Sequence, residues 1–74
     1  MNQTRLTFEH NFSPGELEVA LREELKIKAS VETDEYNFNK ETWRIASSED
    51  ALEVLEWLRK KTGVINIKVE HPSP

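Results

Sequence analysis

The stretch SSEDALEVLEWLRKKTGVINIKVE, residues 47–70, decides the fold of this chain. It opens with Ser47 and Ser48, and the side chain of either serine can accept a hydrogen bond from a free N–H group in the first turn of a helix. An apolar stripe then recurs at helical spacing: Ala51, Val54, Leu55 and Leu58. The pattern predicts a helix that begins at Ser47, and we expect Gly63 to be the left-handed residue that ends it.

Apolar and polar residues alternate over residues 64–70, directly after this glycine. Successive side chains of a strand point to opposite faces, so the alternation predicts a strand that is buried on one face only. The apolar positions, which are expected to face the core, are Ile65, Ile67 and Val69.

A second helix start lies in the first half of the chain. Ser13 is expected to be its N-cap, with Pro14 at the first helical position and Glu16 completing a capping box. No glycine marks the end of this helix, which is expected to fade over residues 26–28. Its apolar stripe consists of Leu17, Ala20, Leu21 and Leu25.

Residues 5–9 and 29–38 are expected to form two more strands. The first alternates, which places Leu6 and Phe8 inward. The second begins with two inward residues, Ala29 and Val31. The acidic pair at positions 34 and 35 is unfavourable in mid-strand and predicts a bulge or a bend.

Turn-forming residues over 37–41 predict a hairpin that leads into a third strand at residues 42–46, with Trp43 and Ile45 inward. The predicted order is therefore βαββαβ. Right-handed crossovers turn this order into an α+β, two-layer sandwich, a four-stranded antiparallel sheet with two helices on one face. This topology resembles the ferredoxin-like fold, with the first and third strands in the centre.

The length of 74 residues predicts a single domain, with an ordered core over about residues 4–70 and a mobile, proline-ended tail at 71–74. The chain has no cysteine, no apolar signal region at its start and no apolar run long enough to cross a bilayer. We therefore expect a cytoplasmic protein without membrane contact. The net charge of −4 argues against nucleic-acid binding through the overall field of the protein.

Catalytic and cofactor signatures are absent from the sequence. The only histidines, His10 and His71, stand near opposite ends, and no ligands occur at metal spacing. The adjacent acids Asp34 and Glu35 would point apart in an extended chain, which makes them a poor acid–base pair. We expect no catalytic residue, no metal and no cofactor.

The open face of the predicted sheet differs from that of RNA-recognition domains, which share this topology and stack bases on aromatic residues of the central strands. The outward positions of these strands carry no aromatic side chain; they are Arg5, Thr7, Glu9, Thr42, Arg44 and Ala46. Base stacking on this face is therefore not expected.

Four apolar residues are candidates for a protein interface: Trp57, Tyr36, Phe38 and Val19. Tryptophan and tyrosine are favoured anchors at interfaces, and all four positions lie away from the predicted apolar stripes or past the predicted bulge. The alternative is that Trp57 covers the edge of the core, and that a bulge turns Tyr36 and Phe38 inward. The sequence leaves both possibilities open.

Both helices are expected to run in the same direction, so that their C-terminal ends meet at one end of the sandwich. Five basic residues are expected there: Lys26, Lys28, Arg59, Lys60 and Lys61. Such a cluster could bind an anion or a nucleic-acid backbone. It could equally be ordinary complementation of the helix dipoles.

These observations favour a small non-enzymatic module that acts through protein–protein contact, either with itself as a homodimer or as an accessory or inhibitor partner. Nucleic-acid backbone binding through the basic cluster is one alternative. A small ligand-sensing domain is the other, because this topology hosts many unrelated functions.

Overall fold

The computed structural model describes residues 3–37 and 39–71. Phe38 and residues 72–74 of the predicted tail lie outside the described residues. The elements are β1 (Thr4–His10), α1 (Glu16–Glu24), β2 (Ser30–Thr33), β3 (Lys40–Ile45), α2 (Ser48–Arg59) and β4 (Val64–Glu70).

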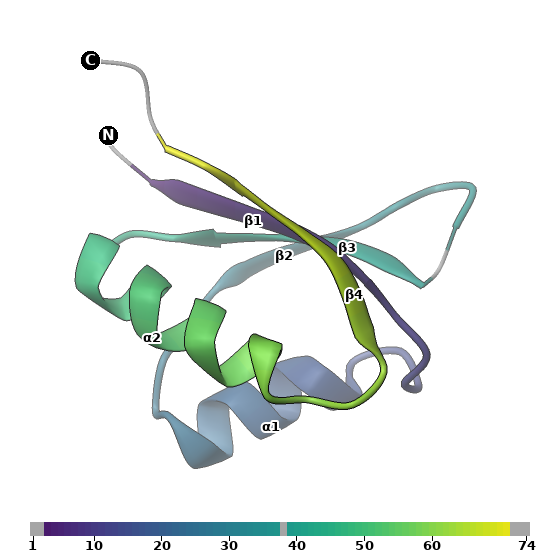
Figure 1. Cartoon of the computed structure of the whole chain (residues 1–74), viewed down its shortest axis with the longest axis horizontal. Helices are drawn as coiled ribbons and strands as arrows, with labels where there is room; N and C mark the ends of the chain where they lie inside the picture. Colours follow the sequence, from purple (N-terminus) through teal and green to yellow (C-terminus); the bar gives the residue numbers. More distant parts are fainter. Residues whose placement is uncertain (1–2, 38, 72–74) are drawn as a thin grey trace.

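The four strands form one sheet in the order β2-β3-β1-β4, and every neighbouring pair is antiparallel. Both helices cover the same face of this sheet, and the other face is open (Figure 1). This arrangement confirms the predicted ferredoxin-like βαββαβ sandwich, with β1 and β3 as the inner strands.

The core lies between the inner strands and the helices. The predicted inward residues of β1 and β3, which include Phe8 and Trp43, are buried, and these two rings meet edge to face with centroids 5.0 Å apart. The remaining buried apolar residues come from both helices and the segment after α1. The full set is Leu6, Phe8, Leu17, Leu21, Ile27, Trp43, Ile45, Ala51, Val54 and Leu58.

The start of α2 is as predicted. Ser47 has an extended backbone, and its hydroxyl accepts a hydrogen bond of 3.3 Å from the N–H group of Asp50. Leu55 is expected in the buried stripe, but it is only half-buried because it lies at the margin of the face that Val54 and Leu58 bury. The helical stripe is therefore narrower than predicted.

The end of α2 differs from the prediction. Its C-cap is Lys60, and Gly63 lies three residues further on, in the turn that leads to β4. Gly63 does have a positive φ of 100°. A side chain at this position would also displace the exposed side chain of Asn11, so the positive φ is the main reason for a glycine here.

The predicted N-cap of α1 is wrong. Ser13 instead begins a tight turn, in which its carbonyl accepts a 3.1 Å hydrogen bond from the N–H group of Glu16. Gly15 has φ 80° and ψ −11°, which with Pro14 before it is the signature of a type II turn. The helix therefore begins at Glu16. One half of the capping box survives, because the Glu16 carboxylate accepts a weak 3.4 Å hydrogen bond from the N–H group of Ser13.

The second strand is shorter than predicted. β2 ends at Thr33, where the Asp34 carboxylate accepts hydrogen bonds of 2.8 and 3.0 Å from the N–H groups of Tyr36 and Asn37. An aspartate side chain that binds the backbone two or three residues ahead builds a turn in place of a strand. The predicted bend at this position is thus confirmed, but the described residues 34–37 do not continue the strand.

The regular alternation predicted for β4 is broken by a bulge. Thr7 of β1 pairs with Lys68, yet Glu9 pairs with Ile65, so two residues of β4 lie opposite Phe8. Asn66, one of these two, has a positive φ of 54°. Ile65 consequently lies on the open face opposite Glu9 and is exposed, contrary to the prediction, whereas Ile67 packs against the core.

Candidate interaction surface at the outer edge of the sheet

A buried polar cluster at one end of β1 and β3 is the first candidate for chemistry. His10, Glu41 and Trp43 all lie on the core side, although the first two are polar. The Glu41 carboxylate contacts His10 Nε2 through one oxygen, and its other oxygen accepts a 2.9 Å hydrogen bond from Trp43 Nε1. The register of the inner strands creates this cluster, because Phe8 lies directly opposite Glu41 and His10 follows two residues later on the same face.

The hydrogen bonds assign the protonation state of His10. The N–H group of Phe12 donates to His10 Nδ1 at 3.0 Å, so this nitrogen carries a lone pair and not a proton. The proton of the neutral ring is therefore on Nε2, which donates it to the Glu41 carboxylate. Both nitrogens of the ring and both oxygens of the carboxylate are occupied within the protein.

The side chains of the cluster are almost completely buried. His10 and Glu41 are each less than 5% exposed, and among the described residues no buried side-chain polar atom lacks a hydrogen-bond partner. A satisfied, enclosed network of this kind orders a core and leaves no group free for acid–base work. No local sequence pattern signals it, because His10 and Glu41 are 31 residues apart.

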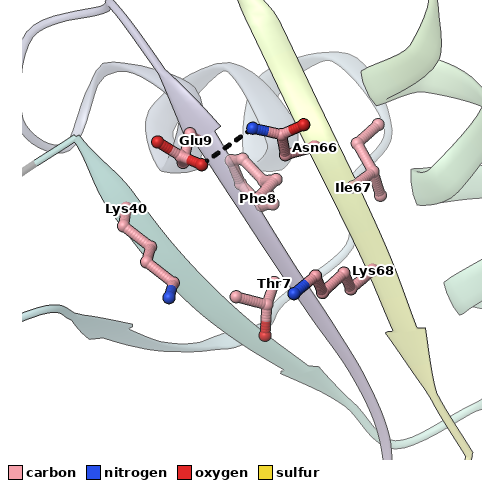
Figure 2. Close-up of a pocket in the computed structure, with 7 residues that line it drawn as sticks. All are labelled: Thr7, Phe8, Glu9, Lys40, Asn66, Ile67 and Lys68. Carbon is pink, nitrogen blue, oxygen red and sulfur yellow. Dashed lines mark hydrogen bonds between the residues drawn. The ribbon is translucent and has the colours of Figure 1, made fainter.

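A hollow lies on the open face, where the bulge of β4 meets β1 (Figure 2). It has a volume of about 410 Å³. At its rim the Asn66 side chain donates a 2.9 Å hydrogen bond to Glu9. Lys40 of β3 and Lys68 of β4 flank the hollow (Figure 2). Its lining is Thr7, Phe8, Glu9, Lys40, Asn66, Ile67 and Lys68.

A second hollow of about 340 Å³ shares Glu9 and continues around the end of the sheet towards Gly63 and Ile65. Its other walls come from His10 and three asparagines, namely Asn11, Asn37 and Asn39. Neither hollow brings two carboxylates, or a nucleophile and a base, to its surface. In the part of the chain that the structure describes, no group of three or more potential metal ligands comes together either.

Cross-strand pairs of charged side chains cover much of the rest of the open face. Arg44 forms an ion pair with Glu32 at 2.9 Å, and Arg5 approaches Glu70 at 3.6 Å. Arg5 lies opposite Arg44, and the next pair on this face, Thr7 and Thr42, shares a hydrogen bond of 3.2 Å. The described part of this face carries no aromatic residue from β1 or β3, as the sequence predicted.

Trp57, the leading candidate for an interface, is half-buried over the edge of the core. Its ring stacks on Trp43 with centroids 6.5 Å apart, and its Nε1 donates a 3.0 Å hydrogen bond to Glu24. The ammonium group of Lys61 lies 4.5 Å from its ring centroid. Its placement is therefore the flank position that the sequence left open as the alternative.

The structure does not bring the predicted interface residues together. Val19 is exposed on α1, whereas Tyr36 is 94% exposed in the loop between β2 and β3, which projects from one end of the sheet (Figure 1). Phe38 lies outside the described residues. Trp57 belongs to the boundary between the two helices, so these positions form no common surface.

The predicted direction of the helices is wrong. Each helix runs antiparallel to the strand that precedes it in the chain. Because β1 and β3 are themselves antiparallel, α1 and α2 run in opposite directions (Figure 1). Because the helices are inclined to each other, their C-terminal ends still touch: Glu24 of α1 accepts a hydrogen bond from Trp57 and forms a 3.5 Å ion pair with Lys61.

The basic cluster offers less free positive charge than its five residues suggest. One of its five members, Lys61, is paired with a carboxylate and lies on a ring. The hydrogen bond from Trp57, followed by the charge of Lys61, lowers the pKa of Glu24, so an anion is held among these cations. The other four members are exposed: Lys26, Lys28, Arg59 and Lys60.

Three further exposed apolar residues belong to β4 and α2, with Ile65 on the open face and Val69 and Leu52 on the helix side. Leu52 is 62% exposed, Ile65 58% and Val69 37%. Leu52 and Leu55 lie on the side of α2 away from Trp57, hence away from α1 and towards β4. Leu52 could have been noticed in the sequence as an apolar residue beside the stripe, but the exposure of Ile65 depends on the bulge.

The backbone of β4 is itself open. β4 is an outer strand of seven residues, and no strand of the described chain pairs with its free side. β2, the other outer strand, has only four residues.

No protein family, curated protein or solved structure matches this chain. Among the described residues, no helix is long and apolar enough to cross a membrane.

Proposed function

We propose that this protein is a small non-enzymatic module that acts by protein–protein contact, and that the contact surface is the free side of β4 with the adjacent flank of α2. The single observation that carries this proposal is a long, unpaired outer strand bordered by exposed apolar residues, namely Leu52, Ile65 and Val69.

Outer strands present a row of free backbone N–H and C=O groups, and soluble proteins normally protect them by shortness, charge, proline or bulges. β2 is protected by its length of four residues. β4 has a bulge near its start, but beyond it Ile67 to Glu70 continue without proline. Backbone pairing along this segment, combined with burial of Val69 and Leu52, is the chemistry of strand addition.

The competing functions receive less support. An anion bound at the helix ends would have to compete with Glu24, which already forms an ion pair with Lys61. A catalytic role would require a reactive group in one of the hollows; His10 lines the second hollow, but its side chain is only 1% exposed. Strand addition uses groups that are already exposed and unpaired.

A site-specific photo-crosslinker tests the proposal. Benzoylphenylalanine placed at Leu52 or Ile65 and activated in cells of the native source is expected to give a discrete protein adduct, identified by mass spectrometry. The matched control places the same group at Glu23, an exposed residue of α1 on the far side of the molecule. Absence of any protein adduct from Leu52 and Ile65, or identical adducts from Glu23, would overturn the proposal.

A further inference from the structure

Resting on this proposed function, we infer that the partner of β4 is a second copy of this chain. The two β4 strands pair antiparallel about a two-fold axis perpendicular to the sheet, with Val69 opposite Val69 of the second copy. The two sheets then form one continuous sheet of eight strands, with all four helices on the same side. The register follows from the faces and charges of β4.

The two-fold axis restricts which residues can lie opposite each other. A rotation about an axis perpendicular to the sheet carries the open face of one copy onto the open face of the other. Residues that are directly opposite in an antiparallel pair must therefore share a face. Lys68 and Glu70 lie on the open face because they pair with Thr7 and Arg5, whereas Val69 pairs with Leu6 and lies on the helix side. Only registers centred on a residue meet this condition.

The bulge shortens the usable segment. Asn66 has a positive φ, and the side chains change face around it, so the regular alternation of β4 starts at Ile67. Centring the pair at Ile67 would place half of the contact on the irregular backbone. This leaves centres at residues 68, 69 and 70.

Charge selects among the three remaining centres. A centre at Lys68 places two ammonium groups opposite each other, and a centre at Glu70 does the same with two carboxylates; like charges in directly opposed positions are destabilising. A centre at Val69 places Lys68 of each copy opposite Glu70 of the other, which forms two symmetric ion pairs on the open face. On the helix side it joins the two valines and brings Ile67 opposite the exposed His71.

The surroundings of β4 suit this pairing. Val69 is 37% exposed although it lies on the helix side, and Leu52 is exposed on the flank of α2 that faces away from α1. The N-terminal end of α2 and the C-terminal end of β4 lie at the same end of the sandwich (Figure 1). A second copy would therefore cover these apolar residues together with the free backbone.

Charge reversal with mutual rescue tests the register. Sedimentation equilibrium is measured for the natural chain, for Lys68→Glu, for Glu70→Lys and for an equimolar mixture of the two variants. The natural chain is expected to dimerise, and each variant alone to raise the dimer Kd at least ~10-fold, because both symmetric pairs become repulsive at once. A far-UV spectrum and a melting curve show that each variant is folded.

The mixture of the two variants is expected to restore association. In the mixed dimer one chain carries a carboxylate at both positions 68 and 70, and the other chain carries an ammonium group at both. Position 68 of each chain lies opposite position 70 of the other, so both pairs again join opposite charges.

The outcomes separate this inference from the proposed function. A natural chain that is monomeric at all concentrations, or a dimer that neither reversal weakens, overturns the self-pairing of β4. A dimer weakened by both variants but not restored by mixing overturns the register centred on Val69. If either result is found, a crosslink from Leu52 to a foreign protein would still support the proposed contact surface. Crosslinks from Leu52 to the same chain alone would agree with self-pairing.

Discussion

The inner and outer strands of this sheet are built differently. Every second residue of β1 is buried, from Thr4 to His10, and β3 buries Glu41, Trp43 and Ile45 in the same way. In contrast, no residue of β2 or β4 is fully buried. The helices cover the inner pair, and the outer pair has one free side each.

This difference separates stability from interaction. The inner strands carry the aromatic contact of Phe8 with Trp43 and the enclosed cluster around Glu41, which a mutation can disturb only by weakening the fold. The outer strand β4 exposes backbone and apolar side chains that contribute little to its own core. Mutations in the two regions should therefore affect different measurements. Substitutions of Trp43 and Glu41, each with a matched control on an outer strand, test this division, and two further predictions concern the helices.

The largest effect is expected for Trp43→Ala. The side chain is fully buried, so its removal should lower the free energy of unfolding by ~3–5 kcal/mol, measured by urea denaturation. Ile65→Ala, on the open face of β4, is the matched edge variant and should change stability by less than ~1 kcal/mol. Equal losses in both variants would break the distinction between inner and outer strands.

The helices offer the same contrast at a smaller scale. Leu21→Ala should cost ~2–5 kcal/mol, because the side chain of Leu21, a residue of α1, is completely buried. Leu55→Ala should cost clearly less, since Leu55 is only half-buried. The comparison of their melting temperatures measures how narrow the buried stripe of α2 is, and a loss from Leu55 as large as that from Leu21 would contradict its position.

Glu41→Gln tests the polar part of the inner strands. The carboxylate accepts from His10 and from Trp43, whereas an amide can offer an oxygen to only one of them and turns its own NH₂ group against the other. One unsatisfied buried donor should cost ~1–3 kcal/mol in urea denaturation.

The control for this substitution is Glu32→Gln in β2. Its ion pair with Arg44 is partly exposed, so the loss should stay below ~1 kcal/mol. If the two substitutions had the same effect, the enclosed cluster would be no more important to folding than a surface ion pair.

The smallest effect concerns the contact between the helix ends and depends on pH. The pKa of Glu24 is lowered in the folded protein from its usual 4.5, first by the hydrogen bond from Trp57 and then by Lys61. Folding therefore favours the ionised carboxylate, and this contribution is fully present above pH 4.5 and is lost as the pH falls through the lower folded value. Glu24→Gln should thus show a slightly smaller loss of stability on acidification than the natural chain. An identical pH dependence of the two proteins would contradict the pKa shift.

The sequence predicted the inner part of the molecule well. Alternation in β1 and β3 and the stripe around Val54 are direct consequences of burial on one face, so they identify Leu6, Phe8, Trp43 and Ile45 as inward residues. Ser47 is also identifiable as the cap of α2 because its signal is local. These features lead to the correct topology.

The errors arise where contacts between distant residues override a local pattern. The alternation of Ile65, Ile67 and Val69 is regular, and only the pairing with β1 shows that a bulge turns Ile65 outward. The Pro14–Gly15 pair suits the beginning of a helix, although proline followed by glycine also favours a type II turn. The cluster of His10 with Glu41 depends on the register between two strands, which the sequence does not specify.

The stacking of Trp57 on Trp43 has a consequence for spectroscopy. The chain contains only these two tryptophans, and their rings lie 6.5 Å apart at an angle of 27°. Transition dipoles so close together couple electronically, which should produce a signal of opposite-signed bands in circular dichroism. One ring belongs to β3 and the other to the end of α2, so this signal reports the docking of the helix layer onto the sheet. It would follow the tertiary assembly of the protein without any added label.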